Sequence, residues 1–184
     1  MVHVRRYHPL LVLLHWAVAL LTMAALLFGA VILAHIPNSD PYKTTGLSKH
    51  MIVGTLILVL VLVRLLVRRV TTLPPKATTG NAFLDKATRI SLGLLYAALI
   101  GQALMGLTLA YQAKLFKVVF AHQGSVPPDF GIYWPHRVHY VLSRLLMLLI
   151  ALHICVALYH TFILKDGLLH RMWFRKRAVG SEAH

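Results

Sequence analysis

The sequence predicts an all-α integral membrane protein, a four-helix bundle with both termini in the cytoplasm. The first observation is composition: 58% of the 184 residues are hydrophobic and 13% are charged, a balance that ordinary soluble domains do not show. The second is that the apolar residues fall into four long blocks, and the third is that basic residues cluster beside some block ends only. The blocks use most of the chain, so we expect residues 1–184 to form one transmembrane domain.

Four helices are expected, over roughly residues 9–34, 48–69, 88–112 and 137–164. Each contains an apolar stretch close to the ~20 residues that an α-helix needs to cross the hydrocarbon core. The first block is too long for a cleaved signal peptide, and no clean cleavage pattern of small residues follows it. Residues 36–49 and 116–135 contain Pro, Gly and Ser and are expected to be ordered loops.

Basic residues indicate the orientation. They gather before the first helix, around the second connection and after the fourth helix, at Arg5, Arg6, Arg68, Arg69, Lys76, Lys86, Arg89, Lys165, Arg171, Arg175, Lys176 and Arg177. The positive-inside rule therefore places both termini in the cytoplasm. The net charge of +14 is explained by this topology and by contact with anionic lipid, so we expect no nucleic-acid partner.

The single cysteine, Cys155, limits the kinds of cofactor. One cysteine forms no disulfide within the chain, offers no C-x-x-C-H motif for covalent haem, and cannot supply the cysteine set of an iron–sulfur cluster. A redox cofactor must therefore be held by histidine and without a covalent link.

The strongest functional signal is the spacing of His139 and His153, which lie fourteen residues apart in the fourth helix. At ~3.6 residues per turn this interval makes almost four turns, so both imidazoles project from nearly the same face. A rise of ~1.5 Å per residue separates them by roughly 21 Å, close to the two limits of a ~30 Å hydrocarbon slab. Metal-binding side chains at both membrane edges of one helix indicate two stacked cofactors.

Two further histidines lie at matching depths. His15 is about six residues into the first helix, and His153 reaches the same cytoplasmic level because the fourth helix runs inward. His50 begins the second helix at the outer level, where His139 begins the fourth. Histidines inside a membrane are costly and mark function. We therefore predict two metal-ligating pairs, His15 with His153 and His50 with His139.

The remaining histidines have a simpler interpretation. A histidine at a helix end is more often an interfacial anchor than a ligand, and this applies to His3, His8, His35, His122, His170 and His184. His136 is the alternative to His139, but it lies seventeen residues from His153 and so points ~100° away around the helix. His139 is therefore the preferred ligand.

Two arginines lie within the apolar blocks. Arg64 follows His50 by fourteen residues and faces the same interior, where a buried guanidinium needs an anionic partner such as a haem propionate. The alternative is that Arg64 reaches the cytoplasmic headgroups together with Arg68. Arg144 points ~140° away from His139, and no role follows for it from the sequence.

Several of these motifs together resemble the bacterial cytochrome b561 family. They are the His15-Trp16 pair, the helix-opening His50, the Arg64-Leu65-Leu66-Val67-Arg68 run, His139 with His153, and the tail Lys165-Asp166-Gly167-Leu168-Leu169-His170-Arg171-Met172. The resemblance covers nearly the whole chain. It implies a multi-pass protein of the bacterial inner membrane that holds two non-covalent b haems by bis-histidine ligation, at the two pairs given above. It also implies electron transfer from superoxide on the outer side to ubiquinone.

The chain departs from that family in one respect. Many members carry a further histidine near the start of the third helix, whereas this sequence has none between His50 and His122. Four ligands still suffice for two haems. The departure leaves the identity of the substrate more open.

His160 is the candidate catalytic residue for quinone reduction. It lies seven residues past His153 on nearly the same face, ~10 Å closer to the cytoplasm. An imidazole exchanges protons near neutral pH, which suits proton delivery to a reduced quinone. The alternative is a histidine that reaches the headgroups.

The electron donor stays open between two kinds of partner. Basic residues near the outer histidines, at Lys49, Lys114, Lys117, His136 and Arg137, would attract superoxide or an acidic periplasmic electron carrier equally well. A different class of function is an anchor subunit that relays electrons for a separate dehydrogenase. A histidine-lined metal transporter fits poorly because the four blocks contain no acidic residue. The sequence does not indicate the quinone type, the haem potentials or the oligomeric state.

Overall fold

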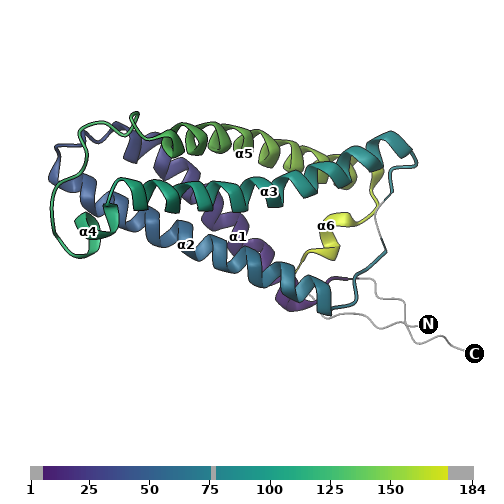
Figure 1. The fold of residues 1–184 in the computed structure, drawn as a ribbon. Helices are drawn as coiled ribbons and strands as arrows, with labels where there is room; N and C mark the ends of the chain where they lie inside the picture. The colour runs from purple at the N-terminus through teal and green to yellow at the C-terminus, as the bar shows by residue number, and fades with distance from the viewer. Residues whose placement is uncertain (1–5, 76–77, 174–184) are drawn as a thin grey trace, which may run out of the picture.

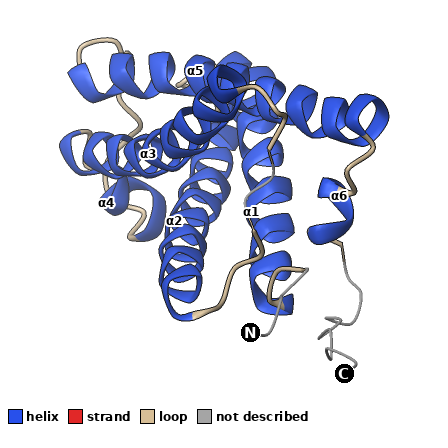
Figure 2. Ribbon diagram, turned by 90° about the vertical axis from the view of Figure 1, so that its right-hand side faces the viewer, coloured by secondary structure: helices blue, strands red, loops and turns tan. Residues whose placement is uncertain are grey.

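The computed structural model describes residues 6–75 and 78–173, which form helices and no strand. The expectations placed on His3, Arg5, Lys76, His184 and residues 175–177 lie outside these residues. The four long helical segments are Pro9–His35, Pro41–Val70, Ala82–Gln112 and Trp134–Leu164, each long and apolar enough to cross a membrane. The predicted fold class, an all-α membrane protein, is therefore confirmed (Figures 1 and 2).

The first and last long segments each contain a π-helical turn after their α-helix. The first consists of α1 (Pro9–Leu27), a π-helix (Phe28–Ile32) and a short 3₁₀ turn (Leu33–His35). The last consists of α5 (Trp134–Tyr159) and a second π-helix (His160–Leu164). Such turns are frequent at functional sites. Here they contain Gly29 and His160, which both belong to the candidate sites described below.

The first helix begins at Pro9 as predicted, whereas the other three long helices begin earlier than the sequence predicted. The second, α2 (Pro41–Val70), was expected from residue 48, but Asp40 caps it by accepting a hydrogen bond from the Tyr42 amide at 2.8 Å. The third, α3 (Ala82–Gln112), was expected from residue 88, and Asn81 caps it through the Phe83 and Leu84 amides. Polar caps of this kind start a helix outside the apolar block, so hydropathy located only the middle of each helix.

Both expected loops also contain helix. The start of α2 occupies part of residues 36–49, and the short α4 (Leu115–Phe120) occupies part of residues 116–135. A last short helix, α6 (Leu168–Arg171), follows the second π-helical turn. In Figure 1, α4 and α6 lie at opposite ends of the bundle. We refer below to the α4 end and the α6 end.

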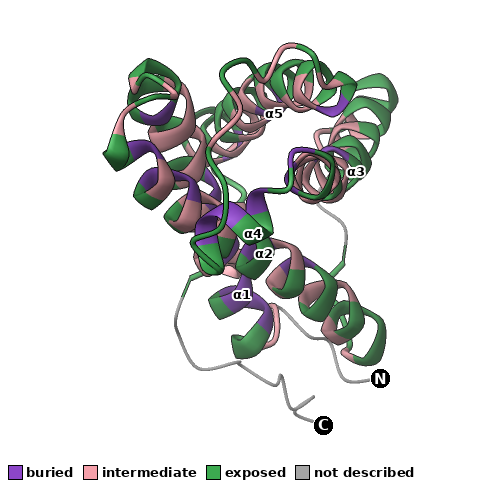
Figure 3. Ribbon diagram, turned by 60° about the vertical axis from the view of Figure 1, so that its left-hand side comes forward, coloured by how far each residue is buried: buried purple, intermediate pink, exposed green. Residues whose placement is uncertain are grey.

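The long helices pack as two hairpins. The most extensive contacts join α3 to α5 and α1 to α2, and α2 also packs on α3. Small clusters of buried side chains hold these contacts, and the cluster at the α4 end consists of Leu33, Leu47, Ala110, Ala113, Leu115 and Val119. Large apolar side chains are exposed along the outward faces of all four helices (Figure 3). Outward apolar faces suit lipid contact, as the composition indicated.

Lys43 ties the end of the first segment to the start of α2. Its side chain is 5% exposed, and its Nζ donates hydrogen bonds to the carbonyl oxygens of Leu33 at 2.8 Å and Ile36 at 2.7 Å. The last carbonyls of a helix lack partners within the helix, and a cation near them is favourable. Lys43 therefore closes the α4 end of the first hairpin.

Replacing Lys43 with methionine is expected to lower the free energy of unfolding by about 2 kcal/mol, because the buried Leu33 carbonyl and the half-buried Ile36 carbonyl lose a charged donor. Thermal unfolding of the detergent-solubilised protein measures this as a fall in Tm. Lys49→Met is the matched control, since Lys49 lies on the same helix with an exposed side chain. Equal changes in the two variants would contradict the capping role of Lys43.

Candidate functional site

The structure brings His15 of α1 against His153 of α5. Their ring centroids are 6.2 Å apart and their planes are inclined by 70°. The two rings come from segments 138 residues apart in the sequence, and burial of each is intermediate. This pair lies toward the α6 end, because Trp16, the neighbour of His15, donates a hydrogen bond to the Met172 carbonyl at 2.9 Å.

The structure brings His50 of α2 against His139 of α5 in nearly the same way. Their ring centroids are 6.1 Å apart and their planes are inclined by 77°. His50 lies about ten residues into α2 and His139 about five into α5, so neither begins its helix as the sequence predicted. Their rings nevertheless meet, and both helices extend past them toward the α4 end.

The spacing of both pairs fits a metal held between two imidazoles. A metal–imidazole nitrogen bond is about 2.0–2.1 Å, and the nitrogen lies roughly 1.1 Å from the ring centre, so two rings on opposite sides of one metal have centroids about 6.3 Å apart. The observed values are 6.2 and 6.1 Å. Among the described residues no group of three or more His, Cys, Asp or Glu gathers into a metal site. Each pair instead offers two imidazoles, the number that could hold one haem iron.

Two glycines allow the helices to approach the rings of the second pair. A methyl group at Gly29 would lie 3.3 Å from His50 Cε1, and one at Gly106 would lie 3.2 Å from His139 Cε1. Both distances are tighter than ordinary contacts, so a larger residue at either position would displace the imidazole. No sequence pattern indicated these glycines, because the contacts join different helical segments.

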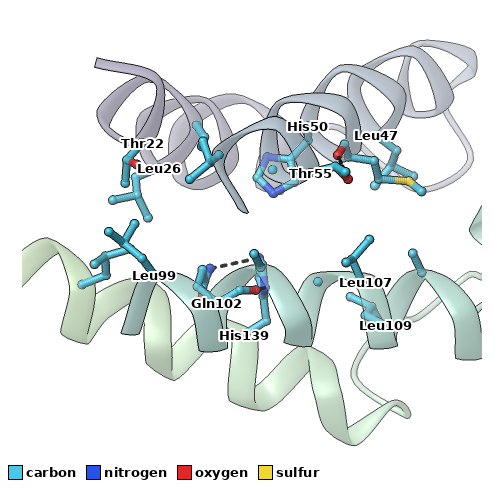
Figure 4. A pocket seen from close by; sticks show the side chains of 18 of the residues that line it. Thr22, Leu26, Leu47, His50, Thr55, Leu99, Gln102, Leu107, Leu109 and His139 are labelled. Atoms are coloured by element: carbon cyan, nitrogen blue, oxygen red, sulfur yellow. Dashed lines mark hydrogen bonds between the residues drawn. The ribbon is translucent and has the colours of Figure 1, made fainter. Parts of the chain in front are cut away.

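An apolar cavity lies between the two hairpins beside this pair (Figure 4). His50 lines one side of the cavity, and His139 with Gln102 of α3 lines the other. Three buried polar atoms around it have no hydrogen-bond partner among the residues that the structure describes: Thr22 Oγ1, His50 Nδ1 and Gln102 Oε1. Buried polar groups normally have partners, so unpartnered ones beside a cavity fit a site that a further group completes.

Arg64 of α2 lies near the first pair, close enough for its charge to act on His15 and His153. Its Nη1 donates to the Tyr96 hydroxyl of α3, and its guanidinium carbon lies 5.5 Å from the Tyr96 ring centroid. Its Nε is buried without a partner. No described carboxylate forms an ion pair with it. The anionic partner expected from the sequence is thus not a protein side chain among the described residues, and Tyr96 is a contact that the sequence did not predict.

Comparison with known proteins decides the family. The model of the prokaryotic cytochrome b561 family matches residues 6–175, nearly the whole chain. The chain belongs to the prokaryotic cytochrome b561 family. This membership confirms the resemblance inferred from the sequence motifs, and with the four long apolar helices it makes the chain a multi-pass bacterial membrane cytochrome.

Two curated relatives are similar over almost their full lengths. A protein named cytochrome b562 from Cereibacter sphaeroides is 33% identical over 170 residues, which cover 90% of this chain and 94% of the relative. A probable superoxide oxidase, CybB, from Yersinia pestis is 26% identical over 187 residues, which cover 94% of this chain and 98% of the relative. The family implies haem b and a role of the oxidoreductase type in electron transfer.

His160 of this cytochrome lies apart from both pairs, in the second π-helical turn. It is 2% exposed, and its Nδ1 lies 2.6 Å from Asp166 Oδ2. Asp166 also accepts a hydrogen bond from the Leu168 amide at 2.9 Å. Partial burial raises the pKa of Asp166, but the hydrogen bonds from His160 and the Leu168 amide, together with the nearby Arg171 charge, outweigh it and leave the pKa lowered. Asp166 is therefore ionised at neutral pH and orients the His160 ring. The sequence did not predict this partner of His160.

The tail of the cytochrome folds back over the α6 end. Besides the bond from Trp16 to Met172, the Trp16 and Trp173 rings lie edge to face with centroids 6.1 Å apart. The Tyr7 amide donates to the Arg171 carbonyl at 3.3 Å. These contacts place α6 beside the start of α1 (Figure 2). Because Trp16 follows His15, they also bring the tail close to the His15/His153 pair. The His15-Trp16 motif therefore connects the His15/His153 pair to the tail.

The other residues singled out from the sequence lie outside the two pairs. His136 stacks on Phe130 with centroids 6.0 Å apart, so its ring has a partner other than His50. Arg144 is exposed on the outside of α5, with its guanidinium carbon 4.9 Å from the Tyr140 ring centroid. The basic residues expected to attract superoxide or an acidic electron carrier lie at the α4 end. Their side chains are exposed at Lys49, Lys114, Lys117 and Arg137 and half-buried at His136.

Proposed function

We propose that this cytochrome is a di-haem electron carrier that passes single electrons from superoxide, at the α4 end, to membrane quinone at the α6 end. The observation that carries the proposal is that two pairs of imidazoles face each other, each with one member on α5. Their ring centroids are 6.2 and 6.1 Å apart. The arrangement supports one b haem held by His15 and His153 and a second held by His50 and His139. A haem supplies reversible one-electron chemistry between ferric and ferrous iron.

The protein residues fix where the electrons go. With two histidines holding each haem, no position on the iron would be left for oxygen, and this would favour outer-sphere electron transfer. Because His139 and His153 belong to one continuous helix, their separation of roughly 21 Å is held constant. The apolar side chains between the hairpins exclude water from the interval. These features support a relay across the membrane.

The α6 end is proposed to face the cytoplasm, and with it both chain termini. Arg68, Arg69 and Arg171 lie toward this end, and the positive-inside rule places such residues on the cytoplasmic side. The His50/His139 pair then lies toward the periplasm. The inner membrane is the proposed location.

Superoxide is proposed as the donor because it is an anion and four of the exposed side chains at the α4 end are basic. Lys49, Lys114, Lys117 and Arg137 would raise its local concentration. The name of the Yersinia pestis relative is consistent with this choice. An acidic periplasmic electron carrier is the alternative, and an electron-conduit subunit that serves a separate dehydrogenase would use the same basic surface for docking.

His160 is proposed as the proton donor to reduced quinone. With Nδ1–H donated to the Asp166 carboxylate, its Nε2 is left to take up and deliver a proton, and the carboxylate stabilises the imidazolium formed in between. Quinone reduction consumes two electrons and two protons, so a proton relay must lie beside the electron exit. Ubiquinone is the proposed acceptor.

Arg64 is proposed to raise the reduction potential of the haem held by His15 and His153, because a positive charge disfavours the ferric state. Arg64→Gln is expected to lower that midpoint potential by tens of millivolts, on the order of 1 kcal/mol, and to leave the other haem unchanged. A spectroelectrochemical titration measures both. Arg144→Gln is the control, since Arg144 is exposed on the outside of α5. A rise in potential, or equal shifts in both haems, would contradict the assignment.

The function is tested by supplying the purified cytochrome with superoxide and a soluble ubiquinone. Excess superoxide is then quenched under anaerobic conditions before the quinol is measured. The expected result is stoichiometric quinol formation that requires both the protein and superoxide. Reduction of the haems by superoxide without quinol formation would favour the conduit subunit instead. Haems that superoxide does not reduce would contradict superoxide as the donor.

A further inference from the structure

Gln102 of α3 binds both ring nitrogens of His139. Its backbone carbonyl oxygen lies 3.0 Å from His139 Nδ1, and its side-chain Nε2 lies 3.0 Å from His139 Nε2 (Figure 4). One residue therefore contacts the imidazole on two sides, the first through its main chain and the second through its side chain. No described residue does this for His15, His50 or His153.

The two contacts define the state of the imidazole. A carbonyl oxygen can only accept, so Nδ1 carries the proton. The neutral ring then presents a lone pair at Nε2, which requires a donor, and the Gln102 amide nitrogen is that donor. His139 is thereby held in the tautomer whose Nε2 can bind a metal, with that same nitrogen occupied by the amide.

The Gln102 amide makes this bond at a cost. Its Oε1 is buried beside the cavity without a hydrogen-bond partner. A buried oxygen without a partner destabilises the arrangement that contains it, so the bond to His139 is what holds the amide in this rotamer. The facing histidine, His50, has an unpartnered Nδ1, so no comparable contact orients it.

We propose that the Gln102 side chain competes with the haem iron for His139 Nε2 and makes the His50/His139 site the more labile of the two haem sites. The inference rests on the proposed ligand pairs. Whenever the iron–His139 bond opens, the amide is within reach to take the nitrogen and delay rebinding. The His15/His153 site has no such competitor among the described residues.

The test is the rate at which the holoprotein loses haem to excess apomyoglobin, compared between the wild type and Gln102→Met. Methionine keeps the length and flexibility of glutamine without its N–H donor. The expected result is about five-fold slower loss from the His50/His139 site, the effect of one ordinary hydrogen bond, and an unchanged rate at the other site. Slower loss distinguishes competition from a merely structural role, since damaged packing would speed it.

Gln112→Met is the matched control, because Gln112 is an exposed glutamine at the end of the same helix. Gln102→Asn is the second variant: its amide is one methylene too short to reach Nε2, so it too should slow the loss. Unchanged or faster loss in both Gln102 variants would overturn the competitor role while leaving the ligand pairs intact. A wild-type chain without haem at the His50/His139 site would overturn the ligand assignment and this inference together.

Discussion

Replacing His153 with leucine is expected to remove one of two b haems and to leave the other in place. The facing ring, His15, cannot hold the iron in bis-histidine ligation alone, whereas the His50/His139 pair shares only α5 with the altered site. His15→Leu should give the same result, and His50→Leu or His139→Leu should remove the other haem. The measurement is the haem-to-protein ratio of each purified variant, which should fall from about two to about one.

His136→Leu is the matched control for these variants, because His136 lies on the same helix, one turn from His139, and stacks on Phe130. It should retain both haems. Loss of a haem in this variant would contradict the choice of His139 over His136. A His153→Leu protein that folds but contains no haem would show that the two sites do not bind independently.

Replacing His160 with phenylalanine is expected to slow quinone reduction by about 100-fold while both haems remain bound, since general acid–base groups contribute effects of this size. His160 is buried in the π-helical turn, and its Nδ1 lies 2.6 Å from Asp166 Oδ2. It belongs to neither of the two histidine pairs. Asp166→Asn should give a smaller loss, because the amide still accepts the Nδ1 hydrogen but no longer stabilises the imidazolium. Stopped-flow oxidation of the reduced protein by quinone measures both rates.

His170→Gln is the control for this experiment, as an exposed histidine of the same tail that makes no side-chain bond to Asp166. Its rate should match the wild type. A His160→Phe protein with the wild-type rate would move the quinone site elsewhere. One that lost a haem would instead make His160 a structural residue of the α6 end.

The fold class could be predicted from the sequence because each long helix contains an apolar block that lipid contact requires. The helix starts could not, because they depend on polar caps outside the blocks. Asp40 caps the start of α2 well before His50, and Asn81 caps the start of α3 before its apolar block. The same limit hid α4, whose six residues are too few for a hydropathy signal.

The histidine pairs could be proposed from the sequence because two of the four lie on one helix, where a fourteen-residue interval fixes both face and depth. Contacts between different helices leave no such interval. Tyr96 beside Arg64, Gln102 beside His139 and Asp166 beside His160 therefore emerged only from the structure. The ligand roles of the histidines themselves stay predictions, supported by ring spacing and by the family.

We propose that one chain holds two haems between two pairs of histidines. The haem content of the purified wild-type protein tests this directly, from a pyridine haemochrome assay combined with an independent measurement of protein. We expect about two b haems per chain, with bis-histidine low-spin spectra for both. A ratio of one would leave one facing pair without an iron and remove the relay across the membrane, and a ratio of zero would contradict both pairs.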